Sequence, residues 1–81
     1  MTIKDIEAAL IRQVASILSI KAEEIKPDAL LHTLGVDSMS FVELLVFIEQ
    51  EFKIKLMESG MTRDDFRTIH ALAKCIVKVK G

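Results

Sequence analysis

Apolar residues recur at helical spacing in three stretches of the chain. In the first stretch, apolar positions three or four residues apart predict a helix over residues 3–18. Thr2 stands where the N-cap of this helix is expected, and Asp5 follows three residues later, which is close to a capping-box pattern. The apolar positions of the stretch are Ile3, Ile6, Leu10, Val14, Ile17 and Leu18.

The second stretch, from Ser38 to about Phe52, has the strongest helical pattern, with Asp37 or Ser38 as its expected N-cap. Its apolar residues cover a wider arc than one core-facing stripe. They divide into a stripe of Met39, Val42 and Val46 and a stripe of Leu44, Leu45, Ile48 and Phe52. Two compatible interpretations stay open: the other helices wrap this one, or one of its sides meets a partner.

The connection between these helices, from Ser19 to Asp37, lacks regular spacing. Pro27 disfavours helical geometry at the residue before it, and Gly35 permits a turn that other residues resist. A long connection without secondary structure is unusual in a small domain and is often functional. The apolar residues expected to anchor it on the core are Ile25, Leu30, Leu31 and Leu34.

The end of the chain predicts the remaining elements. Residues 53–60 connect the second helix to the last region, with Leu56 as an anchor. Thr62 is expected to cap a short helical turn that begins with Asp64 and Asp65. Phe66 then returns to the core and a last helix follows. The apolar face of that helix is Ile69, Leu72, Ile76 and Val79.

These patterns together predict an all-α fold, a small four-helix bundle of three main helices and one short helix in a single domain over residues 1–81. A single cysteine excludes an internal disulfide, and two histidines beside it argue against a structural zinc site. Packing must therefore stabilise the domain. The mean hydropathy of +0.35 indicates either a large core or apolar surface reserved for a partner or ligand.

Charge and apolar runs exclude two classes of partner. The net charge of −1 gives no reason to expect nucleic-acid binding. The longest apolar run is the five residues 44–48, whereas a membrane span needs about 20. Because no signal peptide is recognisable either, we expect a cytoplasmic monomer that binds no membrane. Residues 21–60 carry four basic and eight acidic groups, so a positively charged partner would be steered there.

Ser38 is the strongest candidate for chemistry, because it stands where a long connection enters a helix. The first N–H groups of a helix lack backbone partners and its dipole is positive there, so a phosphate on this serine would be stabilised. Asp37 opposes that phosphate unless a metal ion or a basic partner neutralises it. The alternative is that Ser38 serves only as a helix cap.

The sequence around Ser38 resembles the signature of the acyl and peptidyl carrier proteins. Residues 34–39 read Leu-Gly-Val-Asp-Ser-Met, and residues 41–44 read Phe-Val-Glu-Leu. The family pattern is roughly Leu-Gly-x-Asp-Ser-Leu, followed by an apolar-Glu-Leu step one turn into the helix. The resemblance extends over the chain: its further matches are Ile25, Pro27, Asp28, Leu31, residues 49–52 and residues 65–69.

This resemblance implies a bundle of the acyl-carrier type that is not itself an enzyme. A phosphopantetheinyl transferase would attach 4'-phosphopantetheine from coenzyme A to Ser38. The thiol of that arm would carry acyl or aminoacyl intermediates as thioesters in fatty acid, polyketide or nonribosomal peptide biosynthesis. By the same analogy, Asp37 would help to hold the magnesium ion of the transferase.

The resemblance also implies a partner-binding face for the loading and biosynthetic enzymes. Glu43 and Glu49 would steer basic partners, and Met39 and Val42 would pack against them. The face comprises Val36, Asp37, Met39, Val42, Glu43, Val46 and Glu49. Phe41 and Phe47 are bulky where fatty-acid carriers often have smaller residues, so the resemblance implies that they limit an acyl-binding interior. The chain is also less acidic than such carriers. These departures argue against a generic fatty-acid role, but not against a carrier role.

Other chemistry finds less support in the residues. A Ser-His hydrolase with His32 is rejected, because no glycine follows Ser38 and no parallel sheet is predicted. Cys75 is interpreted as a packing residue of the last helix. Two alternatives stay open: an interaction module in which Ser38 is never modified, and a module that lies on a membrane surface. For the second, the glutamates of the central helix have the wrong sign for anionic lipid.

Overall fold

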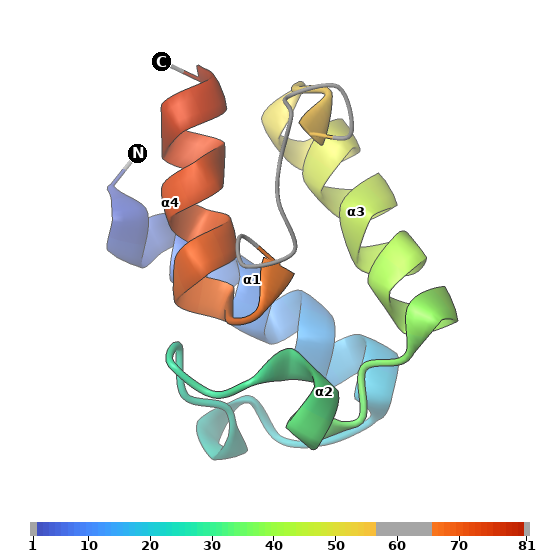
Figure 1. Ribbon diagram of the computed structural model, residues 1–81. Helices are drawn as coiled ribbons and strands as arrows, with labels where there is room; N and C mark the ends of the chain where they lie inside the picture. The colour runs from blue at the N-terminus through green and yellow to red at the C-terminus, as the bar shows by residue number, and fades with distance from the viewer. Residues whose placement is uncertain (1, 57–65, 81) are drawn as a thin grey trace.

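The computed structural model describes residues 2–56 and 66–80, and its described part is all helical apart from turns and one isolated bridge (Figure 1). The order is α1 (Ile3–Leu18), a 3-10 turn η1 (Ala22–Glu24), α2 (Leu31–Leu34), α3 (Ser38–Phe52) and α4 (Ile69–Lys80). Helix α1 contacts both α3 and α4. The predicted all-α bundle with three main helices is confirmed.

Helix α1 begins and ends where local chemistry dictates. Thr2 Oγ1 accepts the backbone N–H of Asp5, and the Asp5 carboxylate accepts the N–H of Thr2, each at 3.2 Å. This reciprocal pair is the predicted capping box, and its two side-chain oxygens accept hydrogen bonds from backbone N–H groups that a helix start leaves unpaired. The helix ends at Ser19, whose φ of 58° is left-handed and turns the chain away.

The core is entirely apolar within the described residues, with no polar or charged side chain buried. Helices α1, α3 and α4 each contribute one face to it. The residues at most 1% exposed are Ile6, Leu10, Val14, Leu44, Ile48, Leu56, Ile69, Leu72, Ala73 and Ile76. Burial of these side chains is the main stabilising contribution in a domain without a disulfide. The predicted anchoring by Leu56 is confirmed.

Helix α3 separates its two apolar stripes as the sequence predicts. The stripe of Leu44, Leu45, Ile48 and Phe52 is at most 6% exposed. In the other stripe, Met39 is 78%, Val42 57% and Val46 47% exposed. The helix is therefore both a core element and the carrier of an apolar outer face. No helix in the described part of the chain combines the length and apolar character needed to cross a membrane.

The connection between α1 and α3 is more regular than its sequence predicts. It contains η1 and α2, which at three and four residues are too short to produce a periodic pattern. Ile25 and Leu31 are buried as expected, and Leu34 is half-buried. The expectation for Leu30 is wrong, because its side chain is 39% exposed. Leu30 precedes α2 and pairs with Thr68 in an isolated antiparallel bridge, outside the buried core cluster.

Side chains of α4 tie it to the two other long helices. His70 Nδ1 lies 2.6 Å from Glu7 Oε2 of α1, and Lys80 Nζ donates to the backbone oxygen of Phe52 at 3.2 Å. Lys80 thus satisfies one of the carbonyl groups that the end of α3 leaves unpaired. The short helical turn expected after Thr62, with Asp64 and Asp65, lies outside the described residues.

Replacing Leu72 by alanine is expected to lower the free energy of unfolding by about 2–5 kcal/mol, because the fully buried side chain leaves a cavity. Val77→Ala is the control on the same helix, since Val77 is 42% exposed. Its effect should stay within about 0.5 kcal/mol. Urea unfolding followed by circular dichroism measures both variants. Equal effects would contradict the placement of Leu72 in the core.

Candidate functional site

The N-terminus of α3 is organised by Asp37. Its backbone is extended, and its Oδ1 accepts the backbone N–H of Ser40 at 2.8 Å. This hydrogen bond from Ser40 lowers the pKa of the Asp37 carboxyl below its ordinary value, because the charged form accepts it better. Asp37 is therefore the N-cap, and the alternative that Ser38 serves only as the cap is wrong.

Ser38 is the first residue of α3, and its side chain is exposed. Since Asp37 supplies the cap, the Ser38 hydroxyl is not needed to satisfy the helix start. Among the described residues, no hydrogen bond occupies this hydroxyl. The arrangement leaves a nucleophilic oxygen open to a visiting enzyme at the positive end of a 15-residue helix.

Helix α2 and the turn that ends it lead the chain into the start of α3 at Ser38. Gly35 has a φ of 105°, in the left-handed region where glycine alone is unstrained. Its N–H donates to the backbone oxygen of His32, and the N–H of Val36 donates to that of Leu31. This turn ends α2 and directs Val36 and Asp37 into the start of α3, so the predicted role of Gly35 is confirmed.

Backbone hydrogen bonds fasten α2 to the start of α4. The N–H of Leu31 donates to the oxygen of Arg67 at 2.9 Å, and the N–H of His70 donates to that of Pro27 at 2.8 Å. Leu30 and Thr68 form an antiparallel bridge between these two bonds. The connection before Ser38 is thereby held against a segment that lies 36–43 residues further along the chain.

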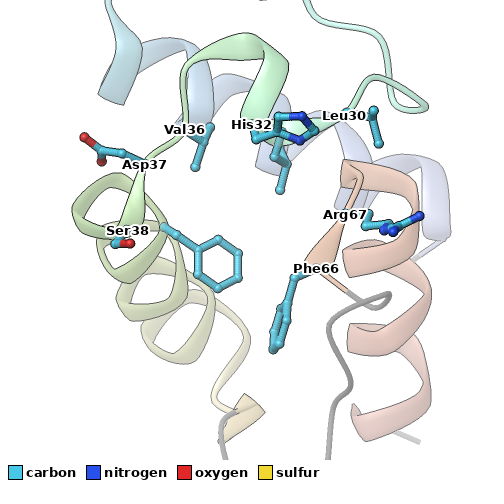
Figure 2. A pocket seen from close by; sticks show the side chains of 9 residues that line it. Leu30, His32, Val36, Asp37, Ser38, Phe66 and Arg67 are labelled. Atoms are coloured by element: carbon cyan, nitrogen blue, oxygen red, sulfur yellow. The ribbon is translucent and has the colours of Figure 1, made fainter.

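A cavity of about 680 Å³ lies between these elements, and Ser38 lines it (Figure 2). Its walls are mostly apolar. The rings of Phe41 and Phe66 meet edge to face, with centroids 5.0 Å apart and an interplanar angle of 82°. In Figure 2 the carboxylate of Asp37 points away from Phe66. The lining residues are Leu30, Leu31, His32, Val36, Asp37, Ser38, Phe41, Phe66 and Arg67.

The structure divides the predicted partner-binding face into two environments. Met39, Val42 and Val46 form an exposed apolar stripe on α3, and the Glu43 side chain is exposed as well. Val36 is half-buried and lines the cavity, so it belongs to the wall beside Ser38 rather than to the stripe. Glu49 is half-buried.

Three residues of the cavity wall, Phe41, Phe66 and Arg67, are not among the site residues that the sequence predicts. Phe41 is three residues after Ser38, so helical spacing places both near one face and would have found it. Phe66 and Arg67 lie far along the chain and carry no local signal. His32 lines the cavity, but among the described residues no hydrogen bond joins it to Ser38.

The site offers one carboxylate to a cation. In the described residues, no three histidine, cysteine or acidic side chains gather as a metal site. Asp37 is the acidic residue that lines the cavity. Because magnesium takes six oxygen ligands, Asp37 would have to share such an ion with ligands from another molecule.

Comparisons with known proteins connect this geometry to a family. A family model described as "Phosphopantetheine attachment site" matches residues 8–76. Aminoacyl carrier protein 2 of Bradyrhizobium diazoefficiens is 30% identical over 73 residues, which cover 90% of this chain and 81% of that protein. An acyl carrier protein of Nitratidesulfovibrio vulgaris is 34% identical over 65 residues, which cover 79% of each chain.

A third similarity is to a much larger protein. The non-reducing polyketide synthase pkdA of Emericella nidulans is 35% identical over 72 residues, which cover 89% of this chain and 3% of the synthase. No solved structure matches the chain.

Asp37→Asn should keep most of the cap, whereas Asp37→Ala should lower the melting temperature more, because asparagine retains an oxygen that accepts the Ser40 N–H. The charge of Asp37 adds stability that is fully present above about pH 4 and is lost as the pH falls through the lowered pKa of the folded state. The melting-temperature difference between wild type and Asp37→Asn should therefore shrink in acid. Thermal unfolding between about pH 7 and pH 3 measures this difference. A constant difference would contradict the lowered pKa of the Asp37 carboxyl in the folded state.

Proposed function

The chain belongs to the phosphopantetheine attachment site family of carrier proteins, whose cofactor is covalently attached 4'-phosphopantetheine, and we propose that Ser38 is its attachment residue. The observation that carries this proposal is the exposed Ser38 hydroxyl at the first residue of α3, with Asp37 supplying the cap beside it. The matched region, residues 8–76, contains this site.

The residues present fit such an attachment. The Ser38 hydroxyl is accessible, so its oxygen can form a bond to the phosphorus that bears the pantetheine arm of coenzyme A. The bond from that phosphorus to the nucleotide breaks, adenosine 3',5'-bisphosphate leaves, and the hydroxyl proton passes to a base of the transferase. The N-terminus of α3 then stabilises the negative phosphodiester on Ser38. Asp37, whose carboxylate is charged at neutral pH, would contribute a ligand to the magnesium ion of the transferase.

When attached, the arm supplies a thiol that holds an acyl or aminoacyl group as a thioester. The chain itself performs no catalysis in this proposal. Its residues present the tethered group to successive enzymes at a high effective concentration. The similarity to an aminoacyl carrier protein, an acyl carrier protein and a polyketide synthase supports cargo from these classes.

The partner enzymes would dock on the outer face of α3. The exposed stripe of Met39, Val42 and Val46 starts one residue after the attachment position, so an enzyme that packs on it also reaches Ser38. Glu43 lies beside this stripe and would attract basic residues of the partner. Asp37, Val36 and Glu49 complete the proposed contact set.

Incubation with coenzyme A, magnesium and a broad-specificity phosphopantetheinyl transferase is expected to add the mass of one phosphopantetheine. Ser38→Ala should show no gain and should unfold like the wild type, because the exposed hydroxyl makes no hydrogen bond in the described structure. Ser40→Ala is the matched control two residues away and should still be loaded. Intact-protein mass spectrometry measures all three.

Two results would contradict the proposal. Loading of Ser38→Ala would place the arm elsewhere. No loading of the folded wild type, with an active control carrier in the same reaction, would favour an interaction module that uses the α3 stripe without modification.

Glu43→Lys is expected to lower kcat/KM for the transferase roughly tenfold, because it replaces an attractive charge at the docking face by a repulsive one. Glu51→Lys makes the same charge change near the other end of α3 and serves as the control. Both variants should have melting temperatures close to wild type, since exposed charges contribute little to folding. Equal losses of kcat/KM in the two variants would show that the loss depends only on the net charge of the protein. That result would contradict a local docking role for Glu43.

A further inference from the structure

The charges of the chain are separated along its length. Residues 21–60 carry four basic and eight acidic groups, whereas residues 61–81 carry five basic and two acidic groups. The net charge of the whole chain is only −1, so two copies do not repel each other strongly. A molecule with this distribution attracts a second copy of itself when the opposite charges lie on separate exposed surfaces.

The outer side of α4 is basic. No acidic residue occurs in the sequence of this helix. Lys74 and Lys78 are exposed one turn apart, and the side chain of Val77 beside them is 42% exposed. The other two basic side chains of the helix, His70 and Lys80, bond to α1 and to the end of α3. Lys74, Val77 and Lys78 therefore form the surface that α4 presents to another molecule, here called the α4 face.

The outer side of α3 has the complementary character. It presents the exposed apolar stripe of Met39, Val42 and Val46 with the exposed Glu43 beside it, here called the α3 face. No basic residue occurs in the sequence of α3. In Figure 1, α3 and α4 stand on different sides of the bundle, and each turns its buried residues to the common core. The two outer faces therefore cannot meet within one molecule.

Charge decides which faces of two copies fit each other. A contact between two α3 faces would bring both Glu43 carboxylates into one interface, and a contact between two α4 faces would gather four lysines. Both arrangements place like charges together, which is unfavourable. An α3 face against an α4 face instead brings Glu43 to Lys74 and Lys78 and covers Val77 with the apolar stripe. The contact is small, one helix face on each side, so it is weak.

We propose that the α4 face of one copy docks on the α3 face of a second copy in a head-to-tail contact with a Kd of about 0.1–1 mM. The chain is then the expected monomer when dilute and associates when concentrated. Because the α3 face is also the proposed docking face for enzymes, a bound copy would compete with them. The contact itself needs no attached arm, so it does not depend on whether Ser38 is modified.

The test uses the unmodified chain. Its backbone amide NMR spectrum is recorded at concentrations between about 0.02 and 2 mM, and sedimentation equilibrium measures the average mass in parallel. The amide shifts of residues 39–46 and 71–78 are expected to move together as the concentration rises, while the average mass increases above that of the monomer. Added salt should reduce both changes, because it screens the charges.

Charge reversal identifies the paired faces. Lys74→Glu/Lys78→Glu and Glu43→Lys should each lower the association constant about tenfold, because like charges then meet. A mixture of these two variants should associate again, since each supplies the faces that complement the other. Lys21→Glu/Lys26→Glu is the matched control, because both lysines are exposed outside the two faces and the net charge changes equally. Its association constant should stay within about threefold of wild type.

Three results would overturn the inference. A monomer with unchanged shifts over the whole concentration range would leave the α4 face to an acidic partner protein of another kind. Shifts confined to the α3 face would indicate a symmetric contact between apolar stripes. Equal losses in the α4 reversal and its control would reflect net charge alone. If a variant loses its folded spectrum, the wild-type shifts at the two faces still decide the question, and none of these results bears on loading at Ser38.

Discussion

The hydrogen bond from the Ser40 N–H to the Asp37 carboxylate is the interaction on which the site depends. Helix α3 begins at Ser38, and the side chain of Asp37, the residue before it, caps the helix. The Ser38 hydroxyl is thereby left exposed at the positive end of the helix dipole. The adjacent negative charge disfavours a phosphate on Ser38 by itself, but in the proposed loading reaction it would provide one ligand to a magnesium ion. One side chain thus serves the fold and the proposed chemistry.

The second constraint is the backbone attachment of α2 to the start of α4. The bonds from Leu31 to Arg67 and from His70 to Pro27 join segments that are distant in sequence. They place the segment that holds Phe66 beside the connection before α3, where the rings of Phe66 and Phe41 meet at one wall of the cavity. The apolar core beneath is closed, while α3 keeps an apolar outer stripe. The same helix therefore separates three surfaces: core, cavity wall and proposed docking face.

The long helices and their caps were predictable because each depends on local signals: apolar spacing, the Thr2–Asp5 pair and Gly35. The position of Asp37 and Ser38 at the start of α3 was predictable for the same reason, whereas attachment of a cofactor to Ser38 stays a prediction. Helix α2 was not, since four residues produce no periodicity. The exposure of Leu30 and the Phe41–Phe66 contact follow from pairing between distant segments. No local pattern in the sequence indicates such pairing.

The most direct test of the account is to locate the modification within the chain. After reaction with coenzyme A and a phosphopantetheinyl transferase, the protein is digested with trypsin, and the peptide that spans residues 22–53 is fragmented by tandem mass spectrometry. The account predicts that the fragments place one phosphopantetheine on Ser38 and none on Ser40. An adduct on Ser40, or on any residue outside this peptide, would contradict it.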